Sequence, residues 1–406
     1  ITLNALVTPP AEPTSNVAGS MYIFKDGADT GFKDYILPAG TVTSTGQWEA
    51  PEALANALAE NSYLRESYYD DEDGWTFGGI VLVNLGNGAP SLVVPSSTTF
   101  KYTADTEAIT AIGGRVYNNG TIDSASVGVA GISNKDAAYI INSGTIKAQD
   151  IGAHIVGQEW EENGTKTTLP AYFWNKSTGQ ISSKFWALIL DYGFARNDGT
   201  ITAGFNGETS YATGASLRNG STFVNNGLVQ VNLGKEINSL LRYGIQVQGN
   251  STFVNTKNGK VVINGNAENA KNLNIIGIHV SGGQVYNYGT IEISNVTLST
   301  AAIVAYGPEA RVYNSGTIIL NNVYLKTYED GVEKITNITD TKTDATAGDT
   351  GFMSLQGGAQ MVTSGVIETS GSINFASFSG KTIALPEAQF ISALSISDDL
   401  YLSPEF

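Results

Sequence analysis

Residues 277–293, GIHVSGGQVYNYGTIEI, contain the unit that is repeated along this chain. The segment divides into three short runs of extended character, IHV, VYN and TIEI, which are separated by SGG and by YG. Val, Ile, Thr and Tyr favour strands, whereas Gly, Ser and Asn favour the turns between them. The segment therefore predicts one unit of three strands joined by two tight turns.

The turn before the third run recurs as the motif Asn-x-Gly-Thr-Ile. Five copies fit this motif, and they begin at Asn118, Asn142, Asn197, Asn287 and Asn314. Looser copies lie between and after them, at residues 175–181, 225–229, 255–261 and 363–367. A constant unit with variable spacing is typical of a solenoid, in which stacked repeats carry their insertions in loops.

The repeat predicts strands rather than helices. Its apolar residues alternate with period two and lack the Leu and Ala spacing of helical or leucine-rich repeats. Three strands and three turns in about 20–30 residues make one coil of a parallel β-helix, which stacks on the next coil at about 4.8 Å. The sequence therefore predicts an all-β fold, a parallel β-helix with three strands per coil.

Two residues of the motif have expected structural roles. We expect the glycine to adopt the left-handed backbone conformation that a sharp corner can require. We expect the Asn of each coil to hydrogen-bond to the Asn of the next coil, because stacked strands place identical side chains in ladders.

Composition narrows the class of function. The chain has 406 residues and a formal net charge of -16, which argues against nucleic acid and anionic membranes as partners because both need a basic surface. It has no Cys, so thiol catalysis, thiolate metal sites and disulfides are excluded. No run of about 18 apolar residues predicts a membrane-spanning helix. The 46 Gly and the low charge content suit an extracellular all-β protein.

The pattern divides the chain into three parts. Residues 1–76 are irregular and are predicted to be a leader and cap, with one short helix over residues 51–68. Residues 77–375 are predicted to form the β-helix. Residues 376–406 are expected to be a terminal coil or a truncated connection.

No set of residues in the sequence predicts catalysis. The two histidines, His154 and His279, are four coils apart and lack neighbours for acid–base chemistry. Outward positions of the third strand place no two carboxylates in neighbouring coils, as a glycosidase or lyase would need. The acidic turn at residues 70–73 suggests calcium, but its spacing does not fit an EF-hand loop and a solvated turn is favoured. We therefore predict no catalytic residue, no metal and no cofactor.

The second strand instead predicts a binding surface. The position two residues before the motif Asn is apolar in every copy, as a core column should be, so the position directly before the Asn should face outward. That outward column is rich in aromatic residues, which are common at interaction surfaces. Insertions near residues 158–170 and 321–351 add more aromatic side chains on loops. The predicted binding residues are Tyr117, Trp174, Tyr286 and Tyr313 on the stripe, and Trp160, Tyr324 and Tyr328 on the insertions. A loop or the 51–68 helix could instead cover the stripe.

Repeated VYNxGTIxI units in an acidic, Cys-free chain rich in Gly, Asn and Thr resemble the passenger domains of Gram-negative autotransporters, in particular their adhesin and self-association branch. The resemblance covers about residues 77–375. It implies a right-handed β-helix that a C-terminal β-barrel exports through the outer membrane, and we expect this chain to be an isolated passenger without that barrel. It also implies a place on the bacterial cell surface, or secretion from it.

The predicted function is that of an adhesin, which would bind a host surface protein or glycan, or copies of itself, through a lateral face and protruding loops. One alternative is a polysaccharide-cleaving β-helix enzyme, either a lyase or a glycoside hydrolase. Another is a spacer stalk that binds nothing. The absence of a carboxylate column and the small number of Lys and Arg, 22 in all, favour the adhesin.

Overall fold

The structure is a computed structural model. It describes residues 8–59, 62–70, 74–205, 212–234, 243–272, 274–298, 302–337, 353–356, 360–363 and 366–369. The chain divides into two compact units. The N-terminal unit consists of Pro9–Ser183 and Tyr192–Ala195, and the C-terminal unit consists of Ile1–Thr8, Lys184–Asp191 and Arg196–Phe406.

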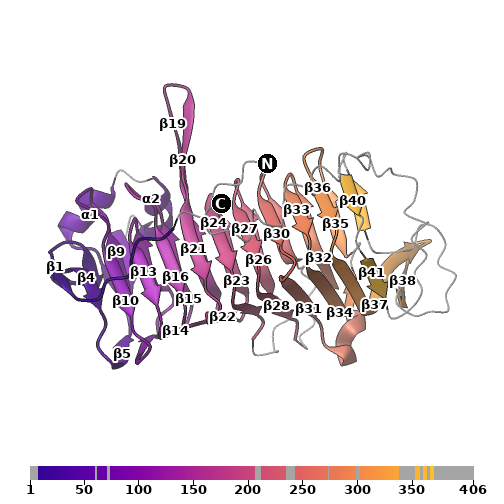
Figure 1. The fold of residues 1–406 in the computed structure, drawn as a ribbon, viewed down its shortest axis with the longest axis horizontal. Helices are drawn as coiled ribbons and strands as arrows, with labels where there is room; N and C mark the ends of the chain where they lie inside the picture. Colours follow the sequence, from indigo (N-terminus) through magenta and orange to yellow (C-terminus); the bar gives the residue numbers. More distant parts are fainter. Residues whose placement is uncertain are drawn as a thin grey trace. The chain divides into compact units, whose positions relative to one another are not determined.

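The N-terminal unit is a parallel β-helix, as the repeat predicts. Each coil contributes one strand to each of three faces, and each strand pairs in parallel with its counterpart in the next coil (Figure 1). The first face contains β9 (Ile80–Val83), β12 (Glu107–Ile112), β15 (Val127–Ile132) and β18 (Ile151–Val156). The second face contains β4 (Phe32–Ile36), β10 (Ser91–Val94), β13 (Arg115–Asn118), β16 (Tyr139–Asn142) and β21 (Ala171–Asn175). The third face contains β5 (Gly40–Ser44), β11 (Thr98–Tyr102), β14 (Thr121–Ser124), β17 (Thr145–Ala148) and β22 (Gln180–Ser183).

The C-terminal unit repeats the same three faces, again with parallel pairing. The first face contains β23 (Trp186–Asp191), β26 (Thr213–Arg218), β29 (Tyr243–Gln248), β32 (Asn274–Ser281), β35 (Ile303–Tyr306) and β39 (Met353–Gln356). The second face contains the end of β24 (Gly193–Asn197), then β27 (Thr222–Asn225), β30 (Thr252–Asn255), β33 (Gln284–Asn287), β36 (Arg311–Asn314) and β40 (Gln360–Thr363). The third face contains β25 (Thr200–Ala203), β28 (Leu228–Asn232), β31 (Lys260–Asn264), β34 (Thr290–Leu298), β37 (Thr317–Glu329) and β41 (Val366–Thr369). A short 3-10 helix, η1 (Ala267–Asn272), precedes β32.

The regular coils begin earlier than the sequence indicated. The predicted boundary near residue 77 is wrong, because β4 and β5 already pair in parallel with β10 and β11. The strand pattern of residues 32–44 is too short to reveal a repeat by itself. At the other end, parallel pairing continues through β41, and residues 376–406 lie outside the described residues.

The cap contains two helices where one was predicted over residues 51–68. They are α1 (Glu52–Leu58) and α2 (Ser62–Tyr68). α2 begins at Ser62, and Ser is a residue type that favours a helix start over a helix interior. Leucines of both helices pack with Val83 and Ile112 in one buried cluster, so the helices cover the outer side of the first face.

Short antiparallel strands complete the cap. β2 (Ile23–Lys25) pairs with β9 at the free edge of the first face and with β3 (Ala28–Asp29), and β1 (Val17–Ala18) pairs with β4 on the second face. A separate small sheet contains β6 (Gln47–Glu49), β7 (Tyr69–Asp70) and β8 (Gly74–Gly78). Antiparallel cover of this kind satisfies backbone groups that the first coil would otherwise leave open.

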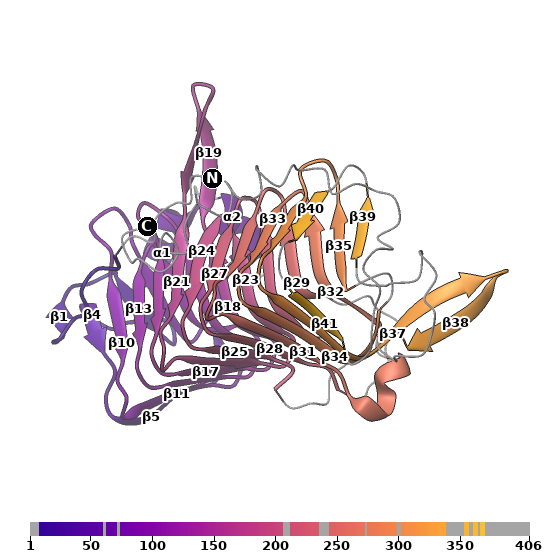
Figure 2. The same cartoon turned by 45° about the vertical axis from the view of Figure 1, so that its right-hand side comes forward.

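Both insertions form hairpins. The first consists of β19 (Gln158–Glu162) and β20 (Thr165–Leu169), which project together from the N-terminal unit (Figures 1 and 2). The second is an extension of β37 that pairs antiparallel with β38 (Val332–Asn337). The rest of the predicted 321–351 insertion lies outside the described residues.

The interior columns are those that the sequence predicts. On the second face Val116, Ile140 and Phe173 are in register and buried, and on the third face Ile122, Ile146 and Ile181 are likewise. The C-terminal unit continues both patterns with the buried residues Phe223, Phe253, Val285 and Val312, and Ile201, Val229, Val261, Ile291 and Ile318. Period-two alternation therefore places these apolar columns inside each unit.

The predicted Asn ladder is confirmed. In the N-terminal unit the Nδ2 of Asn118 donates to the Oδ1 of Asn142, 2.7 Å away, and that of Asn142 donates to Asn175 at 2.8 Å. The second hydrogen of the Asn118 amide goes to the carbonyl of Thr145, which opens the next third-face strand. The ladder starts at Asn118 because Val94 occupies the preceding coil, and the Oδ1 of Asn118 consequently has no partner.

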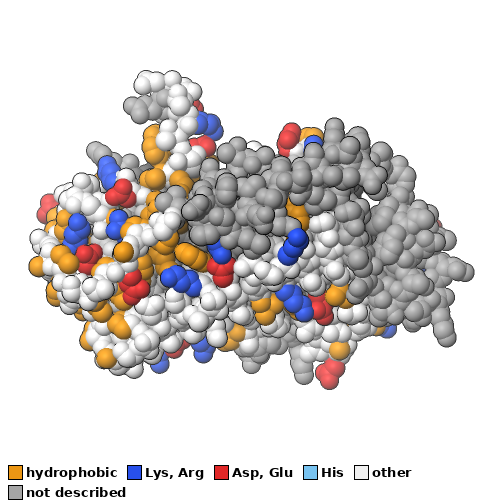
Figure 3. All heavy atoms as spheres, viewed as in Figure 1, with side chains coloured by type: hydrophobic (Ala, Val, Ile, Leu, Met, Phe, Trp, Pro, Cys, Tyr) orange, Lys and Arg blue, Asp and Glu red, His pale blue; other side chains and the backbone are white. Residues whose placement is uncertain are grey.

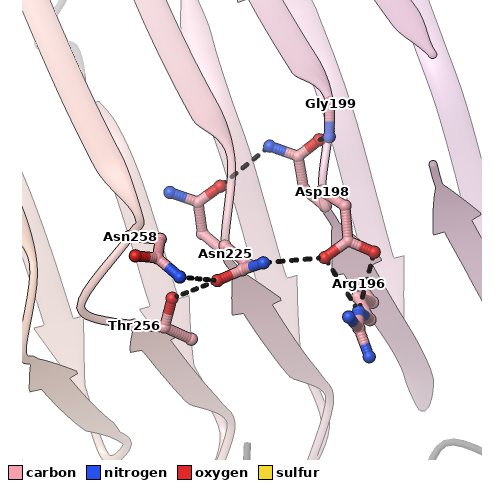
Figure 4. Close-up of polar contacts among 8 residues, drawn as sticks. Arg196, Asp198, Gly199, Asn225, Thr256 and Asn258 are labelled. Carbon is pink, nitrogen blue, oxygen red and sulfur yellow. Dashed lines mark hydrogen bonds and ion pairs between the residues drawn. The ribbon is translucent and has the colours of Figure 1, made fainter. Parts of the chain in front are cut away.

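The ladder recurs in the C-terminal unit, where five buried Asn residues are linked at 2.7–2.9 Å. They are Asn197, Asn225, Asn255, Asn287 and Asn314. Figure 4 shows the ladder at Asn225 and, on the outer side of the same corner, a second polar network in which Asp198 pairs with Arg196 at 2.8 Å. Asn226 donates to Asp198 and accepts from Thr256 and Asn258 in that network.

The predicted left-handed conformation of the motif glycines is wrong. Gly144, Gly227, Gly289 and Gly316 are absent from the residues with positive φ. Glycine is needed for space instead, because a Cβ on Gly144 would lie 2.1 Å from the carbonyl oxygen of Gly120 in the preceding coil. The corresponding separation is 2.2 Å at Gly227 and Gly289. The corner backbones of successive coils stack too closely for any side chain.

Candidate binding surface

The outer side of the second face in the N-terminal unit bears two columns of side chains. Strand register defines both, since residues that alternate with the buried column must point outward. The column next to the Asn ladder contains Ile36, Val93, Tyr117, Ile141 and Trp174. The column two residues earlier contains Asp34, Ser91, Arg115, Tyr139 and Tyr172. Aromatic residues gather toward β16 and β21.

These aromatic rings form an ordered stack. Tyr139 and Tyr172 lie with ring centroids 4.9 Å apart at an interplanar angle of 12°, and Phe194 continues the row at 6.3 Å from Tyr172. Both tyrosines are half-buried, and burial raises the pKa of each hydroxyl. The half-buried ring of Trp174 lies under the Nζ of Lys176, which is 5.4 Å from its centroid. Hydrophobic side chains gather in this region of the surface, below the β19–β20 hairpin (Figure 3).

Tyr117 does not belong to the open part of this surface. It is only 4% exposed, so its predicted exposure is wrong. Its hydroxyl donates to the carbonyl of Pro10 at 2.6 Å and approaches that of Ala11 at 3.3 Å. Burial raises the pKa of Tyr117 to about 12. The N-terminal leader covers this part of the stripe, whereas α1 and α2 cover the first face.

The C-terminal unit departs from the predicted stripe in a similar way. Tyr286 is 2% exposed, so its prediction as an exposed binding residue is wrong, while Tyr313 is half-buried. The two rings stack at 4.7 Å with an interplanar angle of 7°, and the hydroxyl of Tyr286 lies 2.6 Å from the Oε1 of Gln284. Val224 and Val254 in the same column are also buried. This column behaves as a second apolar layer rather than as an open stripe.

The remaining predicted binding residues lie on or near the two hairpins. Trp160 on β19 is 44% exposed and lies opposite Thr167 on β20, as expected for a residue on a projecting loop. Tyr324 on β37 is half-buried, with the Nζ of Lys271 at 5.6 Å from its ring centroid. Tyr328 lies in the same strand, but its side chain is outside the described residues. Of the two predicted loop residues whose side chains are described, Trp160 is thus the more accessible.

The second outward column was not among the predicted binding residues. Tyr139 and Tyr172 could have been found by stepping two residues back from the Tyr117 column, because both columns share one side of the strand. Phe194 is the corresponding residue of the next strand, and Tyr306, at the end of β35, is 56% exposed. Nothing in the repeat marks Tyr306, since Ser281 and Gln356 occupy the same register position on the neighbouring strands.

Two acidic side chains of the third face, Asp123 and Glu292, have basic or apolar neighbours in the adjoining coils. The third-face register places Asp123 beside Lys101 and Lys147, and Glu292 between Val262 and Ile319. Across the ranges given above, no three acidic or histidine side chains are placed to hold a metal ion. Of the acidic turn at residues 70–73, only Asp70 is described.

His154 and His279 are half-buried at outward positions of different units. His279 stacks against Tyr243 at 4.7 Å, its buried Nδ1 has no hydrogen-bond partner, and desolvation lowers the pKa of its imidazole. On the adjoining strands, Gln246 and Val304 are in register with His279.

No family model, no curated protein and no solved structure matches the chain. Within the described part, no helix has the length and apolar character needed to cross a membrane.

Proposed function

We propose that the chain is a cell-surface binding protein, an adhesin of the autotransporter passenger type, and that its contact surface is the outer side of the second face in the N-terminal unit together with the β19–β20 hairpin. The observation that carries the proposal is the stack of Tyr139 and Tyr172 beside Trp174. We name these three residues and Trp160 the aromatic surface.

Chain continuity links the two parts of the aromatic surface. The hairpin ends at Leu169, two residues before β21, which carries Tyr172 and Trp174. Trp160 therefore extends from the corner of the coil that holds the stack. Large aromatic side chains dominate binding energy because they bury much area and lose few rotatable bonds. Stacking already restricts Tyr139 and Tyr172, which lowers the entropy lost on binding further.

The partner class follows from the same features. A host surface protein or glycan, or a second passenger, can be held by stacking and apolar contact without a large Coulomb attraction. A chain of net charge -16 gains little from long-range attraction to anionic cell surfaces. We therefore expect attachment to persist as salt is raised, because screening weakens only the charged contribution.

The test is an attachment assay with purified protein on cells. The variant Tyr139→Ser, Tyr172→Ser, Trp174→Ser should reduce attachment at least about tenfold, equivalent to about 1.4 kcal/mol. Tyr306→Ser is the matched control, since it removes a more exposed aromatic ring in the C-terminal unit. Circular dichroism and thermal melting must show that each variant is folded.

Normal attachment by the folded triple variant would refute the assignment of the surface. Loss of attachment on Tyr306→Ser would move the site to the C-terminal unit. Release of reducing ends from polysaccharides by the wild-type protein, at a steady rate, would replace the adhesin proposal with the enzyme alternative.

A further inference from the structure

The N-terminal leader lies across the second face as a strap, which we define as Pro9–Pro13. Its anchors are the hydroxyl of Tyr117, which donates to Pro10, and the Nδ2 of Asn119, which donates to the Oε1 of Glu12 at 2.8 Å. The strap belongs to no strand, since β1 begins at Val17. It is therefore held by a few side-chain contacts rather than by a backbone ladder.

The strap has the character of a polyproline ligand. Its sequence, Pro-Pro-Ala-Glu-Pro, places Pro10 and Pro13 three residues apart, which is one turn of a polyproline II helix. Pro9, Pro10 and Pro13 are half-buried, whereas Ala11 and Glu12 are exposed. The prolines therefore face the protein and the intervening residues face solvent. Aromatic side chains that donate hydrogen bonds to the carbonyls of proline-rich segments are a recurrent recognition mode.

The face beneath the strap continues beyond it. Val93, Tyr117 and Ile141 form a buried cluster with half-buried Ile36 and Tyr139 packed against it. The next residues of the same face, Tyr172 and Trp174, remain half-exposed. Arg115, in the column of Tyr139, has a buried Nε without a hydrogen-bond partner. An extended chain longer than the strap would bring carbonyl or carboxylate oxygens to that donor.

We propose that the outer side of the second face in the N-terminal unit is a docking surface for an extended, proline-containing peptide of a partner protein, and that Pro9–Pro13 is its resident competitor. The partner segment contains a Pro-x-x-Pro spacing and an acidic residue, as the strap does. Its binding displaces the strap and exposes Tyr117. The proposal deepens the proposed function, on which it rests for the choice of face.

The test uses the full chain in an open form. The double variant Pro10→Gly, Pro13→Gly removes the restriction that proline places on the backbone φ angle. The strap then loses more conformational entropy when it docks, so it is held less firmly. The probe is a fluorescent peptide of residues 8–14, TPPAEPT, followed by anisotropy. We expect the open variant to bind it at least tenfold more tightly than the wild-type chain. A peptide with Gly at the three proline positions is the control and should bind at least tenfold more weakly to the open variant.

A locked form gives the opposite prediction. The chain has no Cys, so Glu12→Cys and Asn119→Cys create the sole thiols, at positions whose side chains are in contact. Bridging them with a reducible bifunctional reagent should abolish peptide binding, and reduction should restore it. Adding Tyr117→Phe to the open variant should weaken peptide binding about fivefold, because it removes the hydroxyl donor and keeps the ring.

The proposal would be overturned if the open, wild-type and locked chains bound the peptide with equal affinity. It would also be overturned if the open variant failed to bind the peptide, or if it bound the glycine peptide as tightly as the proline peptide. Each variant must melt at the wild-type temperature, which shows that a change in binding is not caused by unfolding. If the peptide does not bind but the attachment assay responds to the aromatic substitutions, the proposed function stands without this partner class. If the peptide binds and attachment does not respond, the docking surface stands and the adhesin proposal fails.

Discussion

Asn225→Ala should destabilise the C-terminal unit more than its small size suggests. The side chain is fully buried and makes three hydrogen bonds. It accepts from Asn197 at 2.8 Å, donates to Asn255 at 2.9 Å and donates to the carbonyl of Lys260 at 3.3 Å. All three connect neighbouring coils, so the substitution interrupts the ladder in both directions.

The size of the effect follows from these three bonds. A net contribution of about 1 kcal/mol per bond gives roughly 3 kcal/mol. The amide of Asn197 keeps its bond to the carbonyl of Leu228, but the Oδ1 of Asn255, which is fully buried, loses a donor. Adding the penalty for one unpaired buried group, about 1 kcal/mol or more, brings the expected loss in the free energy of unfolding to about 3–5 kcal/mol.

The neighbouring residue supplies a matched control. Asn226→Ala removes the same side chain at the outer side of the same corner, where Asn226 is half-buried. Water can replace its bonds to Asp198, Thr256 and Asn258, so the loss should stay within about 1 kcal/mol. Urea denaturation followed by circular dichroism gives the two values, and amide hydrogen exchange shows whether the loss is confined to adjacent coils, as expected for stacked repeats. Equal losses for the two variants would refute the argument that the buried ladder stabilises the fold.

Three further predictions concern stability. Ile291→Asp places a charge at a buried position of the interior column, where Ile291 is 1% exposed. The free energy of unfolding should therefore fall by more than about 4 kcal/mol. An unchanged urea midpoint would show that the inner and outer columns are exchanged. Gly289→Ala should lower the free energy of unfolding by about 1–3 kcal/mol, because the new Cβ would lie 2.2 Å from the carbonyl oxygen of Gly259. Gly46→Ala is the control and should have little effect, because a Cβ there has nothing within 4 Å. Similar melting temperatures of the two variants would refute the steric argument. Burial raises the pKa of Glu107 from its usual 4.5, so the stability that its neutral form supplies is fully present below pH 4.5 and is lost as pH rises through the raised value. Glu107→Gln keeps the side chain neutral, so the variant should be more stable than the wild-type protein at neutral pH and should lose that advantage below the usual pKa of the carboxyl. Urea midpoints of both proteins measured across this pH range check the prediction, and a difference that does not change with pH would contradict it.

The fold could be predicted from the sequence because the information is local and repeated. Strand alternation identifies the buried columns that contain Val116 and Ile122, and the shared motif sets their register without further assumptions. The ladder at Asn118 follows from the same stacking. Each copy of the motif confirms the others, so an error in one coil does not alter the assignment.

The exposed surface could be predicted only in part, because cover comes from segments that are distant in sequence. Alternation places Tyr117 outside the interior, and it cannot reveal that Pro10, more than one hundred residues earlier, lies on top of it. Tyr286 is buried although it occupies the same outward column. The motif glycines show a related limit, because their role depends on the separation of stacked corners rather than on their own backbone conformation.

Site-specific photo-crosslinking can show which surface of the protein touches the cell during attachment. A benzophenone amino acid at position 174, on the aromatic surface, is compared with the same group at position 306 in otherwise identical protein bound to living cells. We expect the group at position 174 to form a covalent adduct with a cell-surface molecule, and we expect the group at position 306 to form none. Adducts from position 306 alone, with attachment unchanged in both proteins, would contradict this expectation.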